Sequence, residues 1–323
     1  MTTCKKVLLG IALAFTASCG GGSNGPAMGY RIGLVYFAPE EGADLVMQGL
    51  FDGLQEEGFE EGRNLEVRRS HAQGEIANIP LLIQNLDGSN LDAIVAMTTP
   101  VLTAAASIAR NTPVVFTYIY DPIAAGVGTS RTDHLPLVTG VGSFPPIEDT
   151  VDTIQQLVPG VTAVGTLYNS SEANSVKAIS VARPIFEQRG IDLQEVAVTG
   201  TNDVFQAAQV LTNRGIQALW VTGDNTALQA FDGIVKAAQD AGLPLIINDP
   251  EFVERGALVG VGLGWYETGR GASGILARVL RGENPADIPF EEVAVRKLVL
   301  NQSVADTLGI TFPANMVEAA AQP

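Results

Sequence analysis

The chain has 323 residues, of which 46% are hydrophobic and 17% charged, with two cysteines and two histidines. Its formal net charge of −16 disfavours nucleic acid and anionic membrane surfaces as partners, because like charges repel. A chain of this length exceeds what one hydrophobic core usually serves, so two domains are expected.

The N-terminus has the three-part layout of an export signal. Two lysines precede the apolar run 7–15, and small residues lead from there to Cys19. The apolar run is too short for a permanent membrane span. Small residues followed by Cys-Gly are typical of a bacterial lipoprotein. We therefore predict a signal peptide at 1–18, and an acylated Cys19 with a flexible tether over 19–29. An ordinary signal peptide with an incidental cysteine is the alternative.

Removal of the leader leaves 17 basic and 35 acidic residues, a net charge of −18. Cys4 and Cys19 both fall in the leader or its anchor, so the exported part has no thiol. This excludes disulfides, cysteine nucleophiles and cysteine-ligated metals there. His71 and His134 do not have metal-ligand spacing, so no metal site, cofactor or catalytic triad is expected.

After the tether, short β-branched runs alternate with amphipathic helical stretches. Strands are predicted at 30–37, 64–69, 91–97, 112–118 and 137–144, and helices at 44–57, 76–87 and 100–110. Gly49 and Gly53 lie one turn apart in the first helix, which would let that helix pack closely on a sheet. The βαβ series indicates a parallel sheet covered on both faces.

The same pattern then starts again. Strands are predicted at 163–168, 193–198, 218–222, 243–248 and 257–263, and helices at 147–157 and from about 172, 203 and 225. Pro184 is expected to break or kink the helix that starts near 172. The glycine-rich run 260–271 lacks the spacing and position of a dinucleotide fingerprint, so a flexible crossover between two lobes is expected there.

Ligands of open α/β sheets bind beyond the carboxyl ends of the strands. The loops at these ends are 36–43, 97–102, 118–126, 168–176, 222–228 and 248–253, with 262–269 near the last strand. They contain no Lys or Arg, but they contain Asp121, Glu172, Asp224 and Asp249. Such a lining favours a zwitterion, an amine or a neutral polar solute over a bare phosphate.

Helix starts and aromatic side chains add to this loop set. Thr99, Ser171 and Asn225 are placed at helix N-termini, which attract a carboxylate, although capping alone explains them equally well. The aromatic residues at or beside the loops are Tyr36, Phe37, Tyr118, Tyr120, Tyr168, Trp265 and Tyr266. They could wall an apolar part of a ligand, with ordinary core packing as the alternative for each one.

Several stretches carry a resemblance that spans 30 to about 310. They are QGLFDGLQEEGFEEGRNLEV (48–67), AQGE (72–75), IVAMTTP (94–100), PVVFTYIYDP (113–122), YNSSEANS (168–175), DNT (224–226), RGAL (255–258) and NPADIP (284–289). On these motifs the chain resembles the ABC-transporter substrate-binding lipoproteins of the tryptophan/tyrosine type.

The resemblance implies an α/β fold of two Rossmann-like lobes with parallel sheets, joined by a three-crossover hinge, the type I periplasmic-binding-protein fold. Lobe 1 would comprise 30–145 and about 265–291, and lobe 2 would comprise 146–264 and about 292–323. The ligand-binding residues it implies are Phe37, Thr98, Thr99, Asp121, Ser171, Asn174, Asp224, Asn225, Asp249 and Tyr266. Thr99 and the helix start at Ser171 would hold a carboxylate, and Asp121 or Asp249 an amine.

Two positions depart from the family pattern. Pro39-Glu40-Glu41 stands where the family often has Glu-His-Pro, and Ser170 replaces the usual Pro. Either change could alter the choice of ligand.

The prediction is a monomeric, membrane-anchored extracytoplasmic receptor that closes on an amino acid, with aromatic ones favoured, and passes it to an ABC permease. It is not expected to be an enzyme. The alternatives are a sensory domain that signals to a membrane receptor, or a receptor for a nucleoside, amide or polyamine.

Overall fold

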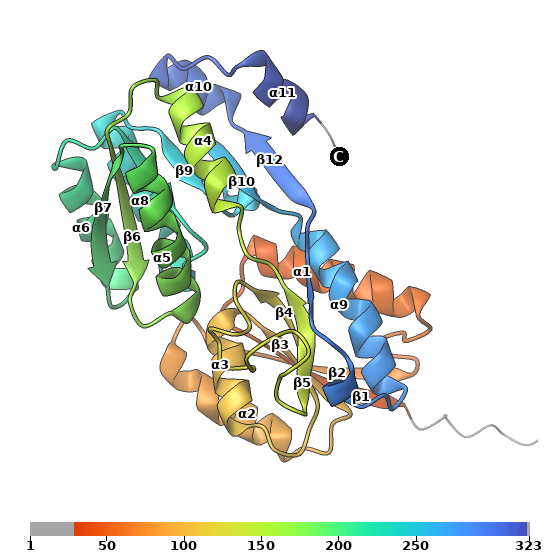
Figure 1. Ribbon diagram of the computed structural model, residues 1–323. Coiled ribbons are helices and arrows are strands. Elements are labelled where there is room, and N and C mark those ends of the chain that lie inside the picture. The colour runs from red at the N-terminus through yellow and green to blue at the C-terminus, as the bar shows by residue number, and fades with distance from the viewer. Residues whose placement is uncertain (1–28, 322–323) are drawn as a thin grey trace, which may run out of the picture.

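The computed structural model describes residues 29–321, so the predicted signal peptide and Cys19 lie outside the described residues. Two six-stranded sheets organise the chain, each belonging to one lobe (Figure 1). Their strand orders are β11-β5-β4-β3-β1-β2 and β12-β10-β9-β8-β6-β7. Every strand pair is parallel except β10 with β12. The predicted pair of α/β lobes is thereby confirmed, and the antiparallel edge strand is an addition to it.

Lobe 1 contains the first sheet and the helices on its two faces. Its elements are β1 (Tyr30–Tyr36), α1 (Glu41–Glu56), β2 (Leu65–His71), the 3-10 helix Ile76–Asn78, α2 (Ile79–Asp87), β3 (Ala93–Met97), α3 (Thr99–Ile108), β4 (Val114–Ile119), β5 (Val138–Gly142), α9 (Trp265–Leu280), the 3-10 helix Pro285–Asp287 and β11 (Glu291–Glu292). Helices α1 and α9 share one apolar cluster, and α2 and α3 belong to another on the opposite face.

Lobe 2 repeats the arrangement. Its elements are α4 (Ile147–Leu157), β6 (Ala163–Asn169), α5 (Ala173–Gln188), β7 (Asp192–Val198), α6 (Thr201–Thr212), β8 (Ala218–Val221), α7 (Asn225–Gln229), α8 (Phe231–Ala241), β9 (Leu245–Ile247), the 3-10 helix Pro250–Arg255, β10 (Val259–Leu263), β12 (Arg296–Leu300), α10 (Gln302–Leu308) and α11 (Ala314–Ala320). The apolar cluster of α1 and α9 continues into α4 and α5, so one core runs through both lobes.

Gly49 and Gly53 of α1 pack against a helix and not against the sheet. A Cβ on Gly49 would lie 2.0 Å from the carbonyl oxygen of Tyr266, and one on Gly53 would lie 2.1 Å from Oγ of Ser273. Gly269 of α9 approaches the carbonyl of Val46 equally closely. The expected close packing exists, but its partner is α9, which the chain reaches more than 200 residues later (Figure 1). Local sequence carries no signal for that distant contact.

Three crossings connect the lobes, at 143–146, at Gly264 and at 293–295. One hydrogen bond joins two of these crossings, from the N–H of Gly264 to the carbonyl of Val295 at 3.0 Å. Another, from the N–H of Val293 to the carbonyl of Gly142 at 2.9 Å, joins the third crossing to the end of β5. The run 260–271 is therefore β10, a one-residue crossing and the start of α9, not a long flexible linker. Pro250 packs directly on Gly260 and Gly262, so a larger residue would not fit at either position.

Pro184 does not break α5, which continues to Gln188. The residue lies on the exposed side of the helix, where water can satisfy the carbonyl that loses its N–H partner. The helix predicted from 225 is instead divided at Ala230 into α7 and α8.

Candidate functional site

Two adjoining cavities lie between the carboxyl ends of the strands of the two lobes. The first is lined by Thr98, Thr99, Tyr118, Tyr120, Asn174, Gly223, Asn225, Leu228 and Asp249. The second is lined by Phe37, Ala38, Glu40, Thr98, Tyr118, Asn225, Leu228 and Gln229. Both are narrow in this structure, with volumes of about 20 Å³ and about 10 Å³, and both lobes line each of them. We call them the inner cavity, which holds Asp249, and the outer cavity, which holds Glu40.

Two strained residues shape both cavities. Thr98 has φ 78° and Tyr118 has φ 62°, backbone angles that residues other than glycine rarely adopt. Tyr118 also lies at a register shift between β4 and β5, which turns its ring toward Trp265 at a centroid distance of 4.6 Å. Strain of this kind persists only where the surrounding structure enforces it, and it is concentrated at ligand sites.

Three buried polar atoms in the inner cavity lack a hydrogen-bond partner within residues 29–321. They are Oγ1 of Thr98, Oδ1 of Asn174 and Oδ2 of Asp249, on side chains of residues that are 6%, 3% and 1% exposed. An unpaired buried polar group costs on the order of 1–3 kcal/mol. A solute that forms hydrogen bonds with these groups would remove that cost.

The electrostatics of the cleft are acidic. Burial, followed by repulsion from Glu40 and Glu251, raises the pKa of Asp249 well above its usual value. Burial also raises the pKa of Glu40 from 4.5 to about 7, against the backbone N–H groups of Gly42 and Ala43 that lower it. The lining of both cavities contains no Lys, Arg or His. A positively charged group would therefore bind favourably there.

Direct contacts hold the two lobes together around the cavities. The hydroxyl of Tyr118 donates to Oδ1 of Asp249 at 3.3 Å, and the N–H of Gly223 donates to the hydroxyl of Tyr120 at 2.7 Å. At the rim, Nζ of Lys177 lies 3.0 Å from Oδ2 of Asp121. The cleft is closed in this structure, so a solute enters by separation of the lobes.

Two other buried acids, Glu172 and Asp224, do not line the cavities but hold the loops of lobe 2 together. Glu172 accepts from the N–H groups of Asn225 at 2.9 Å and Thr226 at 3.0 Å, and from both of their side chains. Asp224 accepts from the N–H groups of Asn169 and Ala227 and from Oγ of Ser175 at 2.6–2.7 Å. Burial, and then Glu172, raises the pKa of Asp224. The motifs YNSSEANS and DNT thus connect two loops of lobe 2.

Six of the ten predicted binding residues line the cavities: Phe37, Thr98, Thr99, Asn174, Asn225 and Asp249. Four do not, and their partners explain why. Asp224 uses both carboxylate oxygens within lobe 2, Asp121 pairs with Lys177, Tyr266 donates to Asp52 of α1, and exposed Ser171 lies outside both linings.

The expected helix caps also shift by one residue. The N-cap of α3 is Thr98, that of α5 is Glu172 and that of α7 is Asp224, not Thr99, Ser171 and Asn225. Among the residues that the binding prediction did not include, Glu40, Leu228 and Gln229 line the cavities. Leu228 carries only the signal of a core stripe, while the carboxylate of Glu40 in a strand-exit loop was a usable signal.

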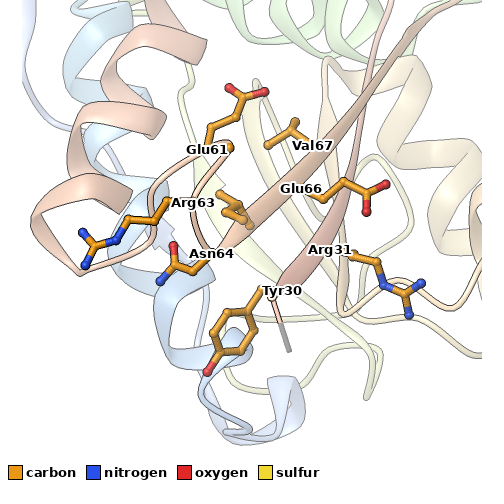
Figure 2. A pocket seen from close by; sticks show the side chains of 10 residues that line it. Tyr30, Arg31, Glu61, Arg63, Asn64, Glu66 and Val67 are labelled. Carbon is orange, nitrogen blue, oxygen red and sulfur yellow. The ribbon is translucent and has the colours of Figure 1, made fainter. Parts of the chain in front are cut away.

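A larger and more open hollow lies elsewhere, at the edge of lobe 1. It has a volume of about 580 Å³ and is lined by Gly29, Tyr30, Arg31 and the stretch 61–67. Figure 2 shows that the side chains of Tyr30, Arg31 and Arg63 point in different directions and do not converge. Arg63 is already paired with Glu60 at 2.6 Å. This open hollow therefore lacks the convergent polar groups of a binding site.

Within residues 29–321, no helix is long and apolar enough to cross a membrane, and no cluster of three or more His, Cys, Asp or Glu side chains could hold a metal ion.

Comparison with known proteins agrees with this geometry. A family model described as ABC transporter substrate binding protein matches residues 31–323. A conserved domain protein from Vibrio cholerae has 30% identity and a TM-score of 0.87, covering 90% of this chain and 98% of that one. An ABC domain from Streptococcus pneumonia, solved with L-Trp, also has 30% identity and a TM-score of 0.87, covering 91% and 99%. A tyrosine-binding protein of Clostridioides difficile is 24% identical, covering 86% of this chain and 80% of its own length.

Two α/β lobes, three crossings and a closed polar cleft define a type I periplasmic binding protein, a class that binds small solutes between its lobes. Within that class, the chain belongs to the family of ABC transporter substrate-binding proteins, as the match over residues 31–323 shows. Members of this family are extracytoplasmic and work with ABC permeases. The resemblance found in the sequence is confirmed.

Proposed function

We propose that this protein captures an amino acid outside the cytoplasm, closes on it and delivers it to an ABC permease without chemical turnover. The observation that carries the proposal is the set of three unpartnered oxygens, on Thr98, Asn174 and Asp249, among the residues that line one cavity between the lobes. Relatives described with L-Trp and as tyrosine-binding support the same ligand class.

The inner cavity provides for both charges of a zwitterion. Asp249 and Oδ1 of Asn174 are acceptors for the α-ammonium group. Thr98 and Thr99 stand at the start of α3, where the hydroxyl of Thr98 and the helix N–H groups suit the α-carboxylate without a guanidinium. Phe37 and Leu228 wall the outer cavity, which is left for the amino-acid side chain.

The experiment is a titration of the purified protein by calorimetry and thermal shift against amino acids, nucleosides and polyamines. Binding to the folded state alone raises the melting temperature with solute concentration. We expect stabilisation by an amino acid, and loss of that stabilisation in Asp249→Asn. Stabilisation by nucleosides only would contradict the proposed ligand class and leave the family unaffected.

Membrane anchoring through an acylated Cys19 is part of the proposal. The sequence around Cys19 supports it. Replacement of Cys19 by Ser in the full chain should move the exported protein from the membrane fraction to the soluble fraction, because the acyl chains are lost. Retention of the Cys19→Ser protein on membranes would count against the anchor.

A further inference from the structure

The outer cavity contains a carboxylate that lobe 1 holds in place. Glu40 is the N-cap of α1, and its two oxygens accept from the N–H of Gly42 at 2.8 Å and the N–H of Ala43 at 2.6 Å. Each carboxylate oxygen has two lone pairs, so capping leaves one on each; the hydroxyl of Tyr118, which also lies against Glu40, can take one of these and leaves the other for a solute. Two anchoring bonds at the start of a 16-residue helix make Glu40 a rigid acceptor.

The surrounding side chains do not neutralise this carboxylate. The other residues that line the outer cavity are Phe37, Ala38, Thr98, Tyr118, Asn225, Leu228 and Gln229, none of which is cationic. Nζ of Lys297 lies 3.1 Å from Oε1 of Glu251 and is paired with that carboxylate, not with Glu40. Asp249 of the adjoining inner cavity is a second acid without a cationic neighbour, and its Oδ2 has no partner within residues 29–321. A solute with a second donor would complete both cavities.

From this geometry we infer that Glu40 is a specificity-determining residue that receives a hydrogen-bond donor, best a cation, at the side-chain end of the bound amino acid. The inference rests on the proposed function, in which Asp249 receives the α-ammonium group. The receptor should therefore bind an amino acid whose side chain ends in an amine more tightly than one of the same shape that lacks the amine.

The apolar walls decide the shape of the probe. Phe37 is 2% exposed and Leu228 6% exposed, and both line the outer cavity beside Glu40. When the lobes move apart to admit a solute, a flat ring can pack against these two side chains with its far end toward the carboxylate. The probes are therefore phenylalanine, tyrosine and para-aminomethyl-phenylalanine, which share one ring and differ only in the group at its end.

The test is calorimetric titration of the full chain with these three probes. The amine should bind at least about tenfold more tightly than phenylalanine, with tyrosine between them, since a charge-assisted bond is stronger than a neutral one. In Glu40→Gln the ratio of amine to phenylalanine affinity should fall to within about twofold. Glu41→Gln, at the exposed neighbouring position, is the matched control and should keep the wild-type ratio.

A loss of capping weakens all three probes alike, so the ratio separates recognition from a structural effect. The ratio of amine to phenylalanine affinity in the wild-type protein is a test that does not depend on the folding of any variant. Equal affinity of the wild-type protein for all three probes, or an unchanged ratio in Glu40→Gln, would overturn this inference and leave the proposed function standing. Failure of folded wild-type protein to bind any of the twenty common amino acids or the amine probe would overturn both.

Discussion

Two pairs of carboxylates meet at the same cleft and differ in what their oxygens contact. Glu172 and Asp224 belong to lobe 2 and accept hydrogen bonds from the loops of that lobe. Glu40 and Asp249 come from opposite lobes and line the two cavities. Oδ2 of Asp249 has no partner within residues 29–321, and the oxygens of Glu40, although they cap α1, face the outer cavity lining without a cation. Burial alone therefore does not identify a ligand contact, because Asp224 and Asp249 are equally buried, at 0% and 1% exposure. The donors already present distinguish the structural pair from the binding pair.

The largest effect is expected from Asp224→Ala. The substitution leaves the N–H groups of Asn169 and Ala227 and the hydroxyl of Ser175 without their acceptor. We expect the free energy of unfolding to fall by about 3 kcal/mol, since several buried donors lose a charged partner. Urea denaturation measures it. Asp203→Ala, at an exposed acid that also accepts from its own loop, is the control and should change stability little. If Asp224→Ala were as stable as the wild type but no longer bound solute, Asp224 would belong with Glu40 and Asp249, and the distinction between the two pairs of carboxylates would be wrong.

Asp249→Asn should do the opposite. We expect solute affinity to fall about 100-fold, because the ammonium group loses its counter-charge, while the stability of the solute-free protein stays equal or rises. The rise has a physical cause, since a carboxylate that burial disfavours is replaced by a neutral amide. Calorimetry and urea denaturation on the same preparation give both quantities. A large loss of stability without solute would place Asp249 in the structural group.

The two α/β lobes could be predicted from the sequence, because hydrophobic periodicity and β-branched runs indicate which segments are buried strands, as in β1 and β6. Sequence reasoning also reached most of the inner cavity because the ends of parallel strands meet at one edge. It could not separate Asp224 from Asp249, since both are acids in strand-exit loops and only the folded chain shows which donors meet each one. The contact of Gly49 with α9 likewise depends on a helix far along the chain.

The binding pair should also make lobe closure depend on pH. Burial raises the pKa of Glu40 from 4.5 to about 7 and raises that of Asp249, while both regain ordinary values in water. Between pH 4.5 and about 7 the closed form holds more protons than the open form, so closure is favoured at the acid end and weakens as pH rises. Tyr118 and Glu251, the latter paired with Lys297, face the same groups.

Small-angle X-ray scattering of the solute-free protein should therefore show a larger radius of gyration at about pH 8 than at about pH 5. Glu40→Gln should reduce the difference, since the amide does not titrate. A saturating ligand that carries a cation should abolish it, because the ligand supplies the missing counter-charge. A radius that is constant with pH, or that decreases as pH rises, would show that the carboxylates do not oppose closure.

The smallest effect belongs to the rim, where Asp121 of lobe 1 pairs with Lys177 of lobe 2 at 3.0 Å. Their side chains are 17% and 41% exposed, so solvent screens the pair and it contributes on the order of 0.5 kcal/mol. Asp121→Asn and Lys177→Met should each weaken solute affinity about twofold, and added salt should remove the difference from wild type. Oδ1 of Asp121 also accepts from the N–H of Ala124 at 2.9 Å, and the amide oxygen of Asn keeps that bond. Both single variants thus remove the same ion pair, so the double variant should be no weaker than either one. A loss of tenfold or more in Asp121→Asn with no loss in Lys177→Met would instead make Asp121 a solute contact, as the family resemblance implies.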